Sequence, residues 1–221
     1  LGIGCIRFKE SLPAEKRSKT GVWATFRSFG IIVHNRRYML YVFQLAFAQG
    51  ILFAYIASSP FIIQQHYGFS PFAFSICFAV NAVAIGVAAA LSVKFRRTEN
   101  GTLTGCVGML VFAVLQMAAL YSGCGFWTYE LLMFALLFMM GLTFTASTTL
   151  AMDCERRYAG AASALLGALC FASGGIVSPL VGLGDILIST GVTFVICAVC
   201  SLLCALWAVK RTGPKVALCR I

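Results

Sequence analysis

The chain alternates long apolar stretches with short polar segments. Each stretch holds roughly 20 or more residues, the length that a helix needs to cross a hydrocarbon core of about 30 Å. Residues 38–93 contain no formally charged side chain and are long enough for two crossings. The pattern predicts six membrane-spanning helices, at about 38–63, 71–93, 102–121, 129–151, 159–183 and 186–209.

The polar segments contain residues that end one helix and start the next. Gly68 favours a turn, and Ser70 followed by Pro71 is typical of an N-cap and a first helical position. Further turns are predicted at 122–125 and at 184–185, where glycines again interrupt the apolar pattern.

A different pattern precedes the first span. Between residues 19 and 37, apolar side chains recur at helical spacing, at Val22, Phe26, Phe29 and Val33. This spacing is typical of a helix that lies along a membrane interface. The polar residues 9–19 before it read as a flexible connector.

The chain therefore divides into three predicted parts. Residues 1–37 comprise the end of a preceding helix, a cytoplasmic connector and the interfacial helix. Residues 38–209 form the six-helix transmembrane bundle, and residues 210–221 form a cytoplasmic tail. Because the sequence opens on a short apolar stub before Arg7, we expect it to be part of a longer protein.

Composition supports a membrane protein, since 60% of residues are hydrophobic and 11% are charged. All 17 Lys and Arg residues lie in alternate polar segments, within 7–37, 94–97, 156–157 and 210–220. Cationic segments stay on the cytoplasmic side, so both ends of the chain are predicted to be cytoplasmic. The basic residues behind the net charge of +10 flank the spans and are expected to contact lipid headgroups, so no nucleic-acid partner is expected.

The reactive residues argue against an enzyme. The two histidines, His34 and His66, fall at opposite faces of the predicted bundle and cannot build a catalytic or metal site together. Cys197, Cys200 and Cys204 share a helical face, but no His or carboxylate joins them. We expect no catalytic residue, metal or cofactor.

Polar side chains within the spans are the candidates for substrate contact, because polar groups at membrane depth need a partner or a function. Gln44 and Tyr55 share one stripe of the first helix, and Asn81 lies near the middle of the second. The fourth helix carries aromatic and hydroxyl groups on one stripe. The predicted lining of a cavity for an amphiphilic molecule is Gln44, Tyr55, Asn81, Phe134, Phe138 and Thr145. Simple core packing is the alternative for each.

Two further features concern packing and charge. Gly174, Ser178 and Pro179 in the fifth helix are predicted to serve close helix packing or a hinge. Glu130, placed in the first turn of the fourth helix, and Asp185, placed in a turn, are expected to be exposed and structural, with carrying a proton as the alternative for each. No acidic residue is predicted in the middle of a span, so no proton relay is evident.

Several segments resemble the major facilitator superfamily, and among its subgroups the bicyclomycin-resistance (Bcr/CflA-type) multidrug/proton antiporters. They are Tyr-Ile-Ala-Ser-Ser-Pro-Phe at 55–61, Gln-His-Tyr-Gly-Phe-Ser-Pro at 65–71, the surroundings of Asn81, Ser-Ala-Leu-Leu-Gly-Ala-Leu at 163–169 and Gly-Gly-Ile-Val-Ser-Pro-Leu-Val-Gly at 174–182. The basic loop at 94–97 is similar to that superfamily's basic loop but lacks its acidic-Arg-x-Gly pattern.

This resemblance implies an all-α membrane protein whose six helices are similar to the C-terminal half of a twelve-helix transporter. It implies proton-coupled export of small amphiphilic, drug-like compounds, with membrane lipid and a missing N-terminal six-helix half as partners. The first, second, fourth and fifth helices would surround the central cavity. A carrier for a nutrient or metabolite, or a truncated half that does not transport, remains the alternative.

Overall fold

The computed structural model describes residues 29–95 and 97–210, and this part of the chain consists of helices and their connections. The long helices are α3 (Arg36–Pro60), α4 (Pro71–Ser92), α5 (Thr98–Tyr121), α6 (Phe126–Cys154), α7 (Ala159–Val181) and α8 (Ile186–Lys210). A π-helical turn, η2 (Phe61–His66), continues α3, and a 3-10 turn, η3 (Arg156–Tyr158), precedes α7. All six long helices are long and apolar enough to cross a membrane, so the predicted all-α fold is confirmed.

Two helices begin earlier than the hydrophobic pattern predicts. α5 begins at Thr98, four residues early, because Glu99 suits the positive end of the helix dipole and lies 3.6 Å from the guanidinium of Arg37. α6 begins at Phe126, because the extended backbone of Gly125 forms its N-cap. The polar first turn of α5 is invisible to a hydropathy argument.

The connections at one end of the bundle have the predicted turn chemistry. Gly68, Gly123 and Gly184 have φ angles of +72°, +68° and +87°, which side chains with a Cβ rarely adopt. The Ser70 hydroxyl accepts a hydrogen bond of 3.2 Å from the Ala73 amide and caps α4 as predicted.

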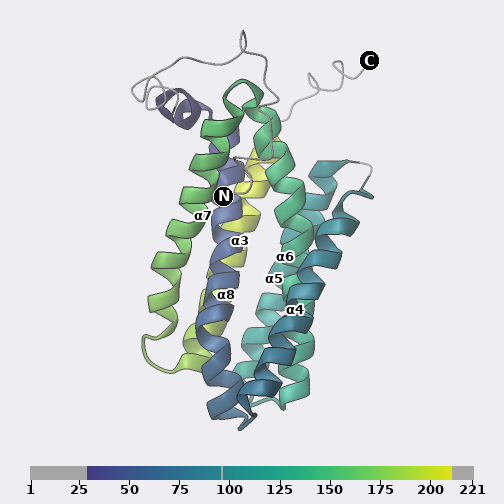
Figure 1. Ribbon diagram of the computed structural model, residues 1–221, viewed down its shortest axis with the longest axis vertical. Helices are drawn as coiled ribbons and strands as arrows, with labels where there is room; N and C mark the ends of the chain where they lie inside the picture. Colours follow the sequence, from purple (N-terminus) through teal and green to yellow (C-terminus); the bar gives the residue numbers. More distant parts are fainter. Residues whose placement is uncertain (1–28, 96, 211–221) are drawn as a thin grey trace, which may run out of the picture.

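α3 and α6 form the centre of the bundle. α3 packs against α6, α7 and α8, whereas α6 packs against α3, α4 and α5, and α5 also packs against α8. α4 is therefore attached mainly to α6, and α7 mainly to α3. Figure 1 shows α7 and α4 on opposite sides of α3.

The core has two parts along the bundle axis. One cluster joins the start of α3, the end of α6, the start of α7 and the end of α8, through Tyr38, Ala151, Ala162 and Ala208. The larger cluster fills the rest of the interior between α3, α5, α6 and α8. The described chain thus enters and leaves the bundle at the same end, as an even number of crossings requires.

Large apolar side chains cover the outside of the bundle. The most exposed include Phe72, Tyr121, Trp127, Leu131, Phe171 and Trp207. Such a surface is unfavourable in water and suits contact with lipid or with another apolar surface. Together with the six apolar helices, it identifies an integral membrane protein.

Some predictions fall on parts of the chain outside the described residues. These are the N-terminal stub, the connector, the tail and the first half of the predicted interfacial helix, including Val22 and Phe26. Residues 29–34, which contain the second half of that helix, are helical.

Candidate functional site

Four polar side chains from three helices meet inside the bundle. Tyr55 comes from α3, Asn81 from α4, and Tyr129 and Glu130 from α6. We call these four residues the polar cluster. Tyr55 and Asn81 were predicted from the sequence as substrate contacts, and the structure brings them together with a carboxylate that was not.

Asn81 is the centre of the polar cluster. Its amide nitrogen donates one hydrogen bond of 2.8 Å to Oε1 of Glu130 and another of 3.1 Å to the phenol oxygen of Tyr55. The Asn81 side chain is 1% exposed, so these bonds replace water that the amide has lost. The bonds connect α4 to both central helices.

The polar cluster keeps unused hydrogen-bonding capacity. Within the described part of the chain, Oδ1 of Asn81, Oε2 of Glu130 and the hydroxyl of Tyr129 are buried without a hydrogen-bond partner. Buried polar atoms are nearly always satisfied in folded proteins, since an unsatisfied one costs about 1–3 kcal/mol. Three such atoms belong to the polar cluster, and Gln44 and Gln116 carry others within the described residues.

Glu130 corrects a prediction from the sequence. It was expected to be exposed in the first turn of its helix, but α6 begins at Phe126, which moves Glu130 into the second turn. There its side chain is only partly exposed and accepts the hydrogen bond from Asn81. The ion pairs among the described residues are Arg37–Glu99 and Arg156–Asp153, so neither includes Glu130.

Aromatic rings surround the polar cluster. The Tyr55 ring stacks on Phe78, with centroids 5.8 Å apart and planes 10° from parallel, and Phe74 lies 6.0 Å from Phe78. Phe134, one helical turn beyond Glu130 on α6, is 37% exposed, as is Phe78. These two rings offer apolar contact area beside the polar groups.

Gln44 lies elsewhere. Its amide nitrogen is 3.2 Å from the Ser201 hydroxyl of α8 and 3.5 Å from Sγ of Cys106 of α5, and the residue is fully buried. The Ser201 hydroxyl returns a bond of 3.1 Å to the Gln44 carbonyl. These contacts lie on the side of α3 that packs against α5 and α8, while Oε1 of Gln44 is buried without a hydrogen-bond partner among the described residues.

The remaining predicted residues lie along α6 and α7. Phe138 and Thr145 are partly exposed on α6, further from its start than the polar cluster. Gly174 of α7 is buried against Phe53, and an added Cβ would clash with that ring. Gly174 therefore permits close approach of α7 to α3.

Ser178 and Pro179 lie near the end of α7. Ser178 is partly exposed and Pro179 is exposed, and the helix continues through Pro179 to Val181. A hinge role for these two residues stays a prediction.

Tyr67, which follows η2, lies at the end of the bundle where Gly68, Gly123 and Gly184 form the turns. The Tyr67 hydroxyl donates a hydrogen bond of 2.9 Å to the Cys124 carbonyl, and its ring contacts Phe126 and Tyr129. Burial raises the pKa of the Tyr67 phenol above its ordinary value, so this group stays a donor at neutral pH. Because Tyr129 belongs to the polar cluster, Tyr67 lies next to that cluster.

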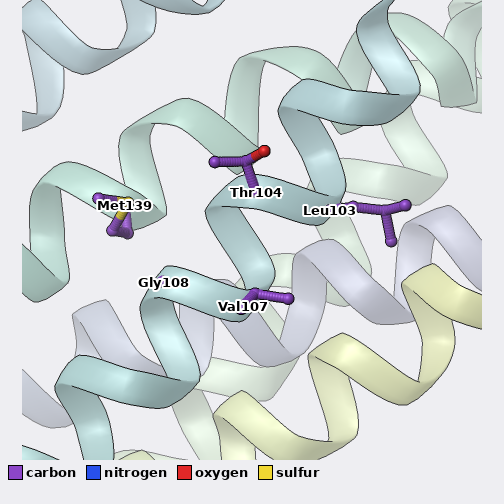
Figure 2. Close-up of a pocket in the computed structure, with 5 residues that line it drawn as sticks. All are labelled: Leu103, Thr104, Val107, Gly108 and Met139. Atoms are coloured by element: carbon purple, nitrogen blue, oxygen red, sulfur yellow. The ribbon is translucent and has the colours of Figure 1, made fainter.

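A separate groove lies between α5 and α6 (Figure 2). It has a volume of about 460 Å³ and is lined by Leu103, Thr104, Val107, Gly108 and Met139. Its lining is almost entirely apolar and contains no residue of the polar cluster. The groove suits a lipid chain better than a polar ligand.

No group of three or more His, Cys, Asp or Glu side chains in residues 29–95 and 97–210 is arranged to hold a metal ion. Cys197 is buried and Cys200 and Cys204 are partly buried in α8, and all three are free thiols. They behave as small apolar side chains.

Comparison with known proteins places the chain in a family. The Major Facilitator Superfamily sequence model matches residues 1–179. The chain therefore belongs to the major facilitator superfamily. This is a superfamily of membrane transporters, so the chain is related to transport proteins and not to enzymes.

A relative within this superfamily is the uncharacterized MFS-type transporter YdgK of Bacillus subtilis (strain 168). It is 35% identical over 184 residues, which cover 81% of this chain and 46% of the relative. The chain thus spans about half the length of the curated relative that it matches.

Proposed function

We propose that this chain is the C-terminal six-helix half of a proton-coupled efflux transporter for small amphiphilic organic compounds. The observation that carries the proposal is the polar cluster: buried acceptors without partners, bordered by exposed aromatic rings, on the helices expected to face a central cavity. Such a combination suits a molecule with an apolar body and a few polar groups.

A second bundle is part of the proposal. In the most apolar windows of α4 and α7, only 17% and 22% of residues are buried, against 56% in α3. The length of the relative supports a missing half of similar size. The two halves would carry the substrate by rocking against each other around a site between them, so this chain alone would not transport.

The proposed substrate contacts are Tyr55, Asn81, Phe134, Phe138 and Thr145. Gln44 is left out because its amide nitrogen is used between α3, α5 and α8, away from the polar cluster. Ser178 and Pro179 are proposed to bend α7 during transport, beside the close contact that Gly174 makes with Phe53. The proposed location is the bacterial inner membrane, with both chain ends in the cytoplasm.

The test is an efflux assay in a bacterium that lacks its main drug exporters. The longer protein, containing this chain and the second bundle, should raise resistance to amphiphilic drugs and lower dye accumulation. A protonophore should abolish both effects, and this chain expressed alone should give neither. Export that persists after the proton gradient is collapsed would refute the coupling.

A nutrient or metabolite carrier is the second candidate, because the superfamily fold does not fix the substrate. It predicts a growth defect on one carbon or nitrogen source after deletion, and no change in drug resistance. A half that does not transport predicts neither effect, even with the longer reading frame.

A further inference from the structure

We infer that the polar cluster binds the protonated amine of the substrate, with Glu130 and Asn81 as its acceptors. The inference rests on the proposed function and names the substrate class: amphiphiles with an N–H-bearing ammonium group. It starts from the atoms that the fold leaves without partners.

The unsatisfied atoms are acceptors held in one small volume. Asn81 uses its amide nitrogen on Glu130 and Tyr55, which leaves Oδ1 free, and Glu130 uses Oε1, which leaves Oε2 free. Because the hydrogen bond between them is 2.8 Å long, both free oxygens lie beside it. With Glu130 ionised, a ligand that completes this arrangement must donate hydrogen bonds.

The charge of Glu130 narrows the class of ligand that could bind there. Among the described residues, the titratable groups that face Glu130 are Tyr55 on α3, Cys77 on α4 and Tyr129 on α6. Phenols and thiols are uncharged at neutral pH. Ion pairs within the described residues do not involve Glu130, so an ionised carboxylate there would require a cation from outside the chain.

The aromatic border fits the rest of such a ligand. Phe78, which stacks on Tyr55, and Phe134, one turn from Glu130, are both 37% exposed. An ammonium group at Glu130 would place its hydrocarbon body over these rings. A quaternary ammonium would keep the charge but could donate no hydrogen bond to the two acceptors.

Three probes with one hydrocarbon body separate these contributions: 4-phenylbutylamine, 4-phenylbutanol and 4-phenylbutyltrimethylammonium. Their binding is measured to the purified complete transporter in detergent, independently of transport. We expect the amine to bind at least tenfold more tightly than the trimethylammonium compound. Glu130→Gln should weaken amine binding at least tenfold and alter alcohol binding less than twofold.

A matched control is Asp153→Asn, which removes another carboxylate whose partner, Arg156, lies three residues away at the surface. It should leave all three affinities unchanged. If Glu130→Gln does not fold, Glu130→Asp keeps the charge on a shorter side chain and should weaken amine binding selectively. The comparison of the three probes on the unsubstituted protein needs no variant.

Equal binding of the amine and trimethylammonium probes would overturn the inference. So would an equal loss of all three affinities in Glu130→Gln, or no loss of amine binding. Failure of the proposed function would look different, because cells would then show no gradient-dependent export whatever the binding data.

Discussion

Asn81 of α4 donates a 2.8 Å hydrogen bond to Glu130 of α6, and this bond joins two residues 49 positions apart in the sequence. Replacing Asn81 with Leu leaves Oε1 of Glu130 and the Tyr55 phenol without their donor. We expect the complete transporter to lose about 1–3 kcal/mol of stability, seen as a lower unfolding midpoint in detergent.

Ser75→Ala is the control for that measurement. Within the described residues, the exposed Ser75 hydroxyl bonds only to the Pro71 carbonyl of its own helix, so its loss should have little effect. An unchanged midpoint in Asn81→Leu would mean that the polar cluster contributes nothing to the fold.

Tyr55→Phe separates the two roles of this side chain. The ring remains to stack on Phe78, whereas the phenol oxygen that accepts from Asn81 is lost. We expect resistance to fall severalfold for some exported compounds and to stay unchanged for others, at equal protein levels. A uniform loss for every compound would indicate a folding role instead.

A larger residue at Gly174 should destabilise the protein, because a Cβ there would clash with the Phe53 ring. Gly174→Ala is expected to cost about 1–3 kcal/mol by overpacking, measured as the unfolding midpoint. Truncating Phe53 to Leu in the same protein should restore part of that loss.

The neighbouring Gly175 provides the matched control, since nothing lies within 4 Å of a Cβ added there. Gly175→Ala should stabilise the helix by about 0.5–1 kcal/mol. Equal effects at both positions would contradict the close approach of α7 to α3.

Gln44→Leu distinguishes packing from substrate contact. The hydrogen bonds to Ser201 and Cys106 predict a loss of about 0.5–2 kcal/mol of stability with no change in the relative resistance to different drugs. Gln65→Leu, at an exposed position, is the control. If the relative resistance to different drugs changed at normal stability, Gln44 would be a substrate contact, as the sequence predicted.

Orientation in the membrane can be tested with single cysteines in a cysteine-free background. Ser122, in the turn before α6, and Arg157, in the turn after it, are both exposed. An impermeant maleimide added to whole cells should label Ser122→Cys and should label Arg157→Cys only after the membrane is broken. The reverse result would invert the proposed topology.

The sequence predicted the helices well because membrane crossing imposes a length and an apolar composition on each one. The glycine turns and the Ser70 cap followed from local backbone chemistry. The surroundings of Glu130 could not be predicted in this way. Hydropathy placed the start of its helix at residue 129, whereas in the structure α6 begins at Phe126, after the extended backbone of Gly125.

Side-chain direction was the second limit. Gln44 and Tyr55 lie on one stripe of α3, eleven residues apart, and helical spacing alone assigned them one role. In the fold Gln44 meets α5 and α8, whereas Tyr55 meets α4. Which neighbour covers each part of a stripe depends on the packing of all six helices, and periodicity carries no such information.

The two hydrogen bonds of Asn81 join α4 to two different helices. One ends on α6, against which α4 packs along its length, and the other ends on α3, which α4 hardly contacts apart from η2. A sliding movement between α3 and the α4–α6 pair would stretch the Tyr55 bond while sparing the Glu130 bond. The infrared amide and phenol frequencies of these side chains would therefore register such a displacement from within the bundle.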